Sequence, residues 1–123
     1  MNTEKKLITI RTTDFTNRPS VRFETQWDNS GEEFYEKYIK KHLKNINDNT
    51  IIEINLDGVL FGYPPSFISE VFGRLYLRLH NDNNLQIWDN MKIISNEDPS
   101  IITTIREESP SYEFDSAKSK YDV

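Results

Sequence analysis

Apolar residues along this chain form short unbroken runs and longer runs that repeat every three or four positions. The clearest unbroken run is 50–56, Thr-Ile-Ile-Glu-Ile-Asn-Leu, which is typical of a central strand covered on both faces. A second run predicts an amphipathic helix over 66–80, with Glu70, Arg74 and Arg78 on its wet side. Its apolar positions are Phe67, Ile68, Val71, Phe72, Leu75, Tyr76 and Leu79.

The first half of the chain carries two further strand-like runs. Segments 6–12 and 21–27 both suit strands, the second with clear alternation, and they predict a hairpin or at least two neighbouring strands. Ser30 and Glu33 match a capping box, so a helix is expected to begin there. It should end near Asn45, because the next residues favour a turn.

The second half is less regular. Residues 85–88 and 91–95 are short apolar segments, and the second is the better strand. Asp98-Pro99 favours a helix start, with Asp98 as the cap. From Glu107 onward the sequence has no period and little to bury, which predicts a mobile tail.

These elements predict an α/β fold in the order β-β-α-β-α-β-α, a mixed sheet packed with helices. The folded domain is expected over 1–106 and a flexible C-terminal tail over 107–123. Sites on such sheets collect beyond the carboxyl ends of the strands. The expected contact surface is therefore the loop and helix start that contain Asp57, Gly62, Tyr63, Pro64, Pro65, Ser66 and Ser69.

Composition narrows the class of protein. The 123 residues include no cysteine, which indicates a reduced, cytoplasmic protein without disulfides. The net charge of −5 argues against nucleic acid as a partner. No apolar stretch suits a membrane span, and residues 1–6 do not introduce a signal peptide. The basic residues Lys37, Lys40, Lys41 and Lys44 suit a solvated helix face.

Few residues point to chemistry. Ser66 is either a structural residue of the helix start or a site of modification, since a phosphate there would meet the positive end of the helix dipole. Asp57 is either an acid/base or metal carboxylate, or the first residue of an Asp-Gly turn. His42 and His80 lack a nearby carboxylate at ligand spacing. No cofactor or metal is predicted.

Four separated blocks carry a resemblance: 29–34, 56–58, 62–75 and 95–101. Together they resemble the small bacterial STAS-like domains of unknown function, over roughly residues 6–107. That family is compared with the STAS domains of anti-sigma-factor antagonists, which bind a kinase-type ATPase and are switched off when a serine at a helix start is phosphorylated. The resemblance implies a signalling module with a histidine-kinase-like ATPase as partner and Ser66 as phospho-acceptor. Pro65 and Phe67 stand where the antagonists have an acidic residue and a glycine.

Three functions follow from these patterns. The first is a non-catalytic interaction module that docks through the loop 57–66 and the helix after it. The second is a sensor of a small ligand or nucleotide, with a pocket near Asp57, Tyr63 and Asn96. The third, an enzyme, has no nucleophile and base pair, phosphate loop or metal signature in its favour. A homodimer through a sheet edge is compatible with all three.

Overall fold

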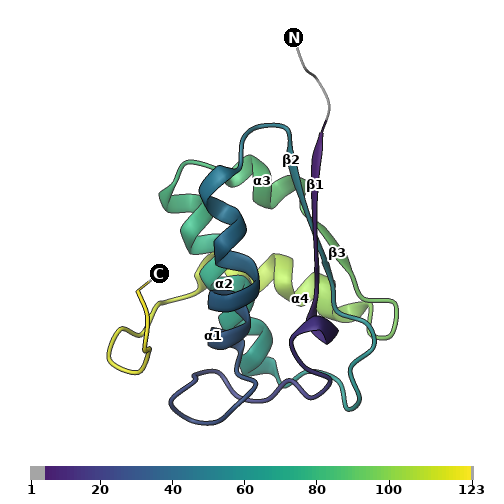
Figure 1. The fold of residues 1–123 in the computed structure, drawn as a ribbon, viewed down its shortest axis with the longest axis vertical. Helices are drawn as coiled ribbons and strands as arrows, with labels where there is room; N and C mark the ends of the chain where they lie inside the picture. Colours follow the sequence, from purple (N-terminus) through teal and green to yellow (C-terminus); the bar gives the residue numbers. More distant parts are fainter. Residues whose placement is uncertain (1–4, 123) are drawn as a thin grey trace.

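The computed structural model describes residues 5–122 and has a sheet of three parallel strands with helices packed on it (Figure 1). The strands are β1 (Lys6–Arg11), β2 (Thr50–Asn55) and β3 (Lys92–Ile94), and β2 lies in the centre. The α/β class is therefore confirmed. Residues 1–4 of the predicted domain and Val123 of the predicted tail lie outside the described residues.

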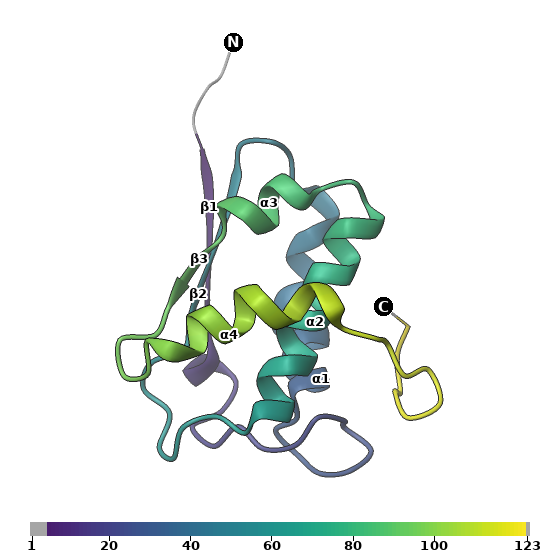
Figure 2. The same ribbon diagram turned by 180° about the vertical axis from the view of Figure 1, so that it is seen from behind.

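The helices are α1 (Gly31–Phe34), α2 (Pro65–Asn81), α3 (Leu85–Asn90) and α4 (Ser100–Glu108). In both views α1 and α2 lie on one side of the sheet, whereas α4 crosses in front of the strands in Figure 2 (Figures 1 and 2). After α1 the same helix continues through a π-helical turn over Tyr35–Ile39 and 3-10 turns over Lys40–Asn45, so it ends where the sequence predicted. Short 3-10 turns also follow β1, over Thr12–Asp14, and α4, over Ser109–Ser111.

The core lies between the sheet and the helices. Isoleucines on the inner face of the strands align across the ladder, Ile8 beside Ile52 and Ile10 beside Ile54. They pack with the buried face of α2, where Val71, Phe72 and Leu75 are fully buried. The outer face carries no helix, and Leu7 on it is 56% exposed. The prediction that β2 is covered on both faces is therefore wrong, although its central position is right.

The predicted strand over 21–27 does not form. Its backbone serves the start of α1 instead, because the carbonyls of Val21 and Arg22 accept hydrogen bonds from the N–H groups of Gly31 and Glu32. The first N–H groups of a helix lack partners within the helix, so this use of the segment satisfies them. Without this strand, the predicted hairpin, the mixed sheet and the order β-β-α-β-α-β-α are wrong.

At the start of α1 only half of the predicted capping box forms, and at the start of α4 the cap is a different residue from the predicted one. The Ser30 hydroxyl accepts a hydrogen bond from the backbone N–H of Glu33 at 3.1 Å, as the capping pattern predicts. The Glu33 carboxylate pairs with Lys37 at 2.6 Å. Residues 85–88, predicted only as a short apolar segment, lie in α3, and β3 confirms the strand predicted in 91–95. Pro99, and not Asp98, is the N-cap of α4.

Candidate functional site

The loop between β2 and α2 is held at its first residues by the loop between β3 and α4. The carboxylate of Asp57 accepts hydrogen bonds from the backbone N–H of Asn96 at 3.2 Å and of Glu97 at 3.0 Å, and from the Asn96 side chain at 3.0 Å. In return, the Glu97 carboxylate accepts a hydrogen bond from the N–H of Gly58. The two loops therefore support each other at the carboxyl edge of the sheet.

These bonds define the state of Asp57. The hydrogen bond from the backbone N–H of Glu97 does most to hold the pKa of Asp57 below its ordinary value. The hydrogen bonds from the backbone and side chain of Asn96 lower this pKa further. The side chain is thus a carboxylate whose oxygens already serve three donors. This arrangement supports the turn interpretation of Asp57 more than an acid/base or metal role.

Tyr63 points into the domain at the other end of the loop. Its hydroxyl donates a hydrogen bond to the carbonyl of Leu56 at 2.6 Å, and its ring lies 5.7 Å from that of Phe67. Burial raises the pKa of Tyr63 to about 12, so the phenol stays neutral at physiological pH. Tyr63 therefore fixes the loop and is not the aromatic contact that the loop presents.

Leu60 and Phe61, at the middle of this loop, are the residues that sequence reasoning missed. Phe61 is 82% exposed and Leu60 is 56% exposed. The backbone N–H of Leu60 donates to the carbonyl of Asn17 at 2.8 Å, and the Arg18 guanidinium lies 5.4 Å from the centre of the Phe61 ring. The sequence did contain a signal for an exposed apolar pair. Leu60 and Phe61 stand together between Gly58 and Gly62 and belong to neither a helical nor a strand repeat.

The start of α2 borders this loop. Pro64 is the N-cap and Pro65 the first helical residue, so half-buried Ser66 lies in the first turn and does not cap the helix. The N–H groups of Phe67 and Ile68, in the same first turn, donate to the carbonyl of Pro64. Gly62 has a φ of +75°, a backbone conformation that glycine adopts at low cost.

Two small cavities lie at the same end of the molecule. One, of about 210 Å³, has Asp57, Leu60, Tyr63 and Glu97 among its lining residues. The other, of about 200 Å³, lies between α2 and α4, with Ser69 and Thr104 in its wall. Of the residues predicted to form one site, Asp57, Gly62 and Tyr63 line the first cavity, and Tyr63, Pro65 and Ser69 line the second. Asn96 lies beside the first cavity, on Asp57.

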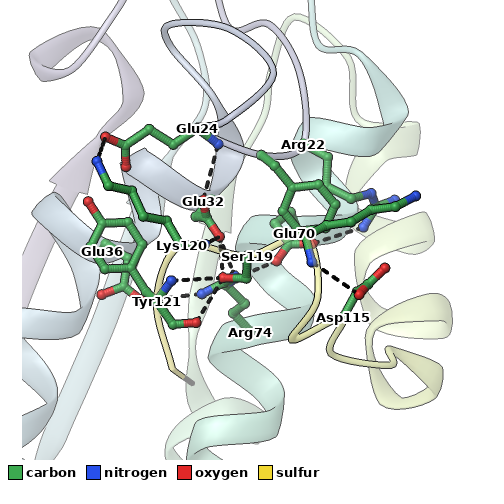
Figure 3. A network of polar contacts seen from close by, with 12 residues as sticks. Arg22, Glu24, Glu32, Glu36, Glu70, Arg74, Asp115, Ser119, Lys120 and Tyr121 are labelled. Carbon is green, nitrogen blue, oxygen red and sulfur yellow. Dashed lines mark hydrogen bonds and ion pairs between the residues drawn. The ribbon is translucent and has the colours of Figure 1, made fainter.

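A second polar site lies on the far side of α2 and was not predicted. Arg74 is fully buried and faces three carboxylates: Glu32 at 2.6 Å, Glu36 at 3.2 Å and, bonded to its Nε, Glu70 (Figure 3). Arg22 adds a second cation to Glu70 at 3.0 Å. The prediction that Glu70 and Arg74 lie on the wet side of the helix is wrong, because α1 and the C-terminal segment cover that side.

Electrostatics keep Arg74 charged. Burial lowers the pKa of Arg74, but the hydrogen bond and the charge of Glu70 outweigh burial and raise the pKa above its ordinary value. Glu32 also accepts a hydrogen bond from the backbone N–H of Glu24 at 3.1 Å. Buried charges persist only when they are paired and hydrogen-bonded, and these groups meet both conditions.

The C-terminal segment closes the cluster. Tyr112 donates a hydrogen bond to Glu70 at 2.6 Å, the Phe114 ring centre lies 5.0 Å from the Arg74 guanidinium, and Ser119 contacts both Arg74 and Glu32. Since α4 runs to Glu108 and these contacts follow, the predicted boundary at residue 107 does not mark the end of the packed structure.

Two lysines of the basic cluster are engaged in ion pairs. Lys37 and Lys40 of the basic cluster pair with Glu33 and Glu36 on their own helix. Over residues 5–122, no three acidic or histidine side chains gather closely enough to hold a metal ion. Within that range, no helix is both long and apolar enough to cross a bilayer.

Comparisons with models of protein families, with curated proteins and with solved structures found no match for this chain.

Proposed function

We propose that this chain is a non-catalytic protein-interaction module that docks a partner through the loop between β2 and α2. The observation that carries the proposal is the exposure of Leu60 and Phe61, 56% and 82%, on a loop whose backbone is anchored. Large apolar side chains gathered at one exposed place are a common mark of a binding surface. Phenylalanine and arginine are both enriched in protein interfaces, and Phe61 lies beside Arg18.

The anchoring of the loop supports this function. Asp57 and Gly58 are tied to the β3–α4 loop, Leu60 to Asn17, and Tyr63 to Leu56. A loop that is already ordered loses little conformational freedom when a partner binds, so more of the contact energy appears as affinity. Docking also needs no catalytic group, which agrees with an Asp57 carboxylate that already serves backbone donors.

The partner class comes from the STAS-like resemblance. We infer a histidine-kinase-like ATPase as partner, with modification of Ser66 as a possible control on docking. Ser66 lies in the first turn of α2, next to the exposed loop, so a phosphate there would add about −1.5 to −2 charges beside the docked surface. A homodimer through a sheet edge is compatible with this function, as it is with the others.

Matched variants test the docking surface. The full chain is immobilised and its partner is captured from the source cells, then identified by mass spectrometry and purified. Leu60→Ser and Phe61→Ser should each weaken binding of that ATPase by about tenfold or more, the scale of a hot spot. Leu7→Ser is the control for Leu60, because both leucines are 56% exposed and Leu7 lies on the outer face of the sheet. Equal losses for Leu7→Ser and Leu60→Ser would contradict the loop as the surface.

The modification is tested separately with the purified partner. Ser66→Asp should lose binding and Ser66→Ala should keep it, with melting temperatures checked first. If both variants bind like the wild type, Ser66 is a structural residue and the phosphorylation switch is refuted. The docking surface is tested independently of Ser66, by Phe61→Ser.

A small-ligand sensor is the second candidate function. It is favoured by the two cavities of about 200 and 210 Å³ at the carboxyl edge of the sheet. A ligand that binds the folded chain raises its melting temperature by mass action. A screen of nucleotides and small metabolites that gives no shift above the scatter of replicates would remove this candidate.

A further inference from the structure

The strand β1 leaves one edge of the sheet open. The strand order is β1-β2-β3, so within residues 5–122 β1 is paired with β2 alone (Figure 1). The N–H of Lys6 donates to the carbonyl of Asn49, next to β2, at 2.9 Å, and alternate residues of a paired strand face the same neighbour. The backbone groups of Leu7 and Thr9 therefore face away from β2, and none of them has a hydrogen-bond partner within that range. Unpaired backbone groups on an edge strand are a template for another strand.

A cavity of about 180 Å³ borders this edge. Its lining residues come from the end of β1, Thr9 to Arg11, and from the helix that continues α1, which contributes Tyr38, Lys41 and His42. None of the described lining residues belongs to β2, so the cavity lies on the open side of β1. An added strand would place every second side chain toward this cavity, because successive side chains of a strand point to opposite faces.

Positive side chains surround the open edge. Lys6 begins β1, Arg11 ends it, and Lys41 lies in the cavity wall, and all three are exposed. In the described part of the chain none of the three forms an ion pair, whereas Lys37 and Lys40 on the same helix as Lys41 both do. The chain carries a net charge of −5, so this local excess of positive charge is not a general property of its surface. It favours a partner of negative charge.

The two faces of the edge differ in charge. Burial, followed by the charges of Lys41 and Lys6, lowers the pKa of His42, which indicates that both lysines act on this side of the cavity. Asp14 is the one carboxylate among the described lining residues. On the outer face, Glu53 accepts a hydrogen bond from a hydroxyl of β1 at 3.2 Å. Negative side chains of an added strand are therefore favoured on the face of Lys41 and disfavoured on the face of Glu53.

We propose that the open edge of β1 is a docking site for an extended acidic segment of a partner protein. The segment adds to the three-stranded sheet as a further strand. Its backbone pairs with Leu7 and Thr9, and alternate carboxylate side chains face Lys6 and Lys41. Backbone pairing gives this kind of docking its affinity, and the alternate side chains give its specificity. The occupant is identified by charge complementarity with the unpaired cations. The site is separate from the loop at Phe61, so this inference does not depend on the proposed function.

The test uses the full chain and a capped synthetic peptide of six residues, the length of β1, with alternating glutamate and valine. Binding is measured by fluorescence anisotropy of the labelled peptide. The peptide should bind saturably, and the same peptide with lysine in place of glutamate should bind at least about tenfold more weakly. Lys41→Glu should weaken binding of the glutamate peptide at least about tenfold, whereas Lys44→Glu should not. Lys44 is the matched control, because it is exposed on the same helix but is not among the residues that line the cavity. Circular dichroism checks that both variants fold.

A second measurement reports on strand pairing itself. Amide hydrogen exchange of the isotopically labelled wild-type chain is followed by NMR with and without the glutamate peptide at millimolar concentration. The amides of Leu7 and Thr9 should exchange at least about tenfold more slowly with the peptide, while that of Phe61 keeps its rate. Absence of saturable binding, equal binding of the glutamate and lysine peptides, or unchanged exchange at Leu7 and Thr9 overturns the proposal. A chain that self-associates through these amides and refuses the peptide also overturns it, and assigns the edge to a second copy of the chain.

Discussion

Replacing Arg74 by leucine tests the buried charge cluster most directly. The change removes one cation from Glu32, Glu36 and Glu70, and Arg22 remains only on Glu70. The Glu32 side chain, 0% exposed, is then left without a cation. Breaking a buried ion pair in this way costs about 3 to 5 kcal/mol, because an uncompensated charge stays in the interior. With an unfolding entropy of about 2.1 cal/mol/K per residue, this corresponds to a melting temperature lower by about 12 to 19 °C for a 123-residue chain.

The assay is thermal unfolding by calorimetry at pH 7, with Arg78→Leu as the matched control. Arg78 lies one turn farther along α2, is 25% exposed, and pairs with Asp82 at 2.7 Å. An exposed pair of this kind contributes about 0.3 to 0.5 kcal/mol, so the control should melt within about 2 °C of wild type. If Arg74→Leu and Arg78→Leu melt within 2 °C of each other, the cluster does not stabilise the fold as argued. The double variant Arg74→Leu/Glu32→Gln should recover part of the lost melting temperature, because Glu32→Gln removes the unpaired buried charge.

The remaining predictions concern packing, capping, pH and the C-terminal segment. Phe72→Ala should cost about 3 to 5 kcal/mol in chemical denaturation, because Phe72 is fully buried, and a loss under 1 kcal/mol would contradict its place in the core. Ser30→Ala should cost about 1 kcal/mol in the same assay through the lost cap, whereas an unchanged midpoint would make the bond to Glu33 irrelevant. The depressed pKa of Asp57 means that its contribution is present above its unfolded pKa and is lost as pH falls through the folded value. Asp57→Asn should therefore melt below wild type at pH 7, and the difference should shrink as the pH is lowered through the folded-state pKa of Asp57; a difference that is the same at pH 7 and in acid would argue against the charge. Gly73→Ala places a methyl group 2.2 Å from the Tyr112 ring, so it should push away the C-terminal segment that begins at Tyr112. Trypsin should then cleave after Lys118 and Lys120 faster than in wild type, whereas equal rates would show that the Tyr112 ring moves without releasing the segment.

Local sequence patterns predicted the elements that carry a strong period or an unbroken apolar run. The strand over 50–56 and the helix over 66–80 appear as Thr50–Asn55 and Pro65–Asn81, within one residue at each end. The segment 21–27 also alternates, yet it forms no strand. Phe23 is its buried apolar residue, while Trp27 is 70% exposed, and its carbonyls serve α1. Alternation alone does not show whether a neighbouring strand is available.

The residues expected to form a contact surface lie near one another at one edge of the sheet, and their role as a site stays a prediction. Asp57, Tyr63 and Ser69 do lie around cavities at the carboxyl edge of the sheet. Leu60 and Phe61 were missed, because the exposure of a loop side chain depends on whether the rest of the fold offers it a cavity.

The sequence by itself determined the strands β1 and β2, the helix α2 and the turns beside them, but not the structure of segment 21–27 or of α3. These choices depend on residues within a few positions of one another, through β-branching, helical period and turn residues. The tertiary structure decided which charges are buried and where the C-terminal segment lies. Glu32 and Arg74 meet across 42 positions, and Arg74 and Ser119 across 45. A charged side chain is stable in the interior only when its partners arrive there too, and those partners come from α1 and from the end of the chain.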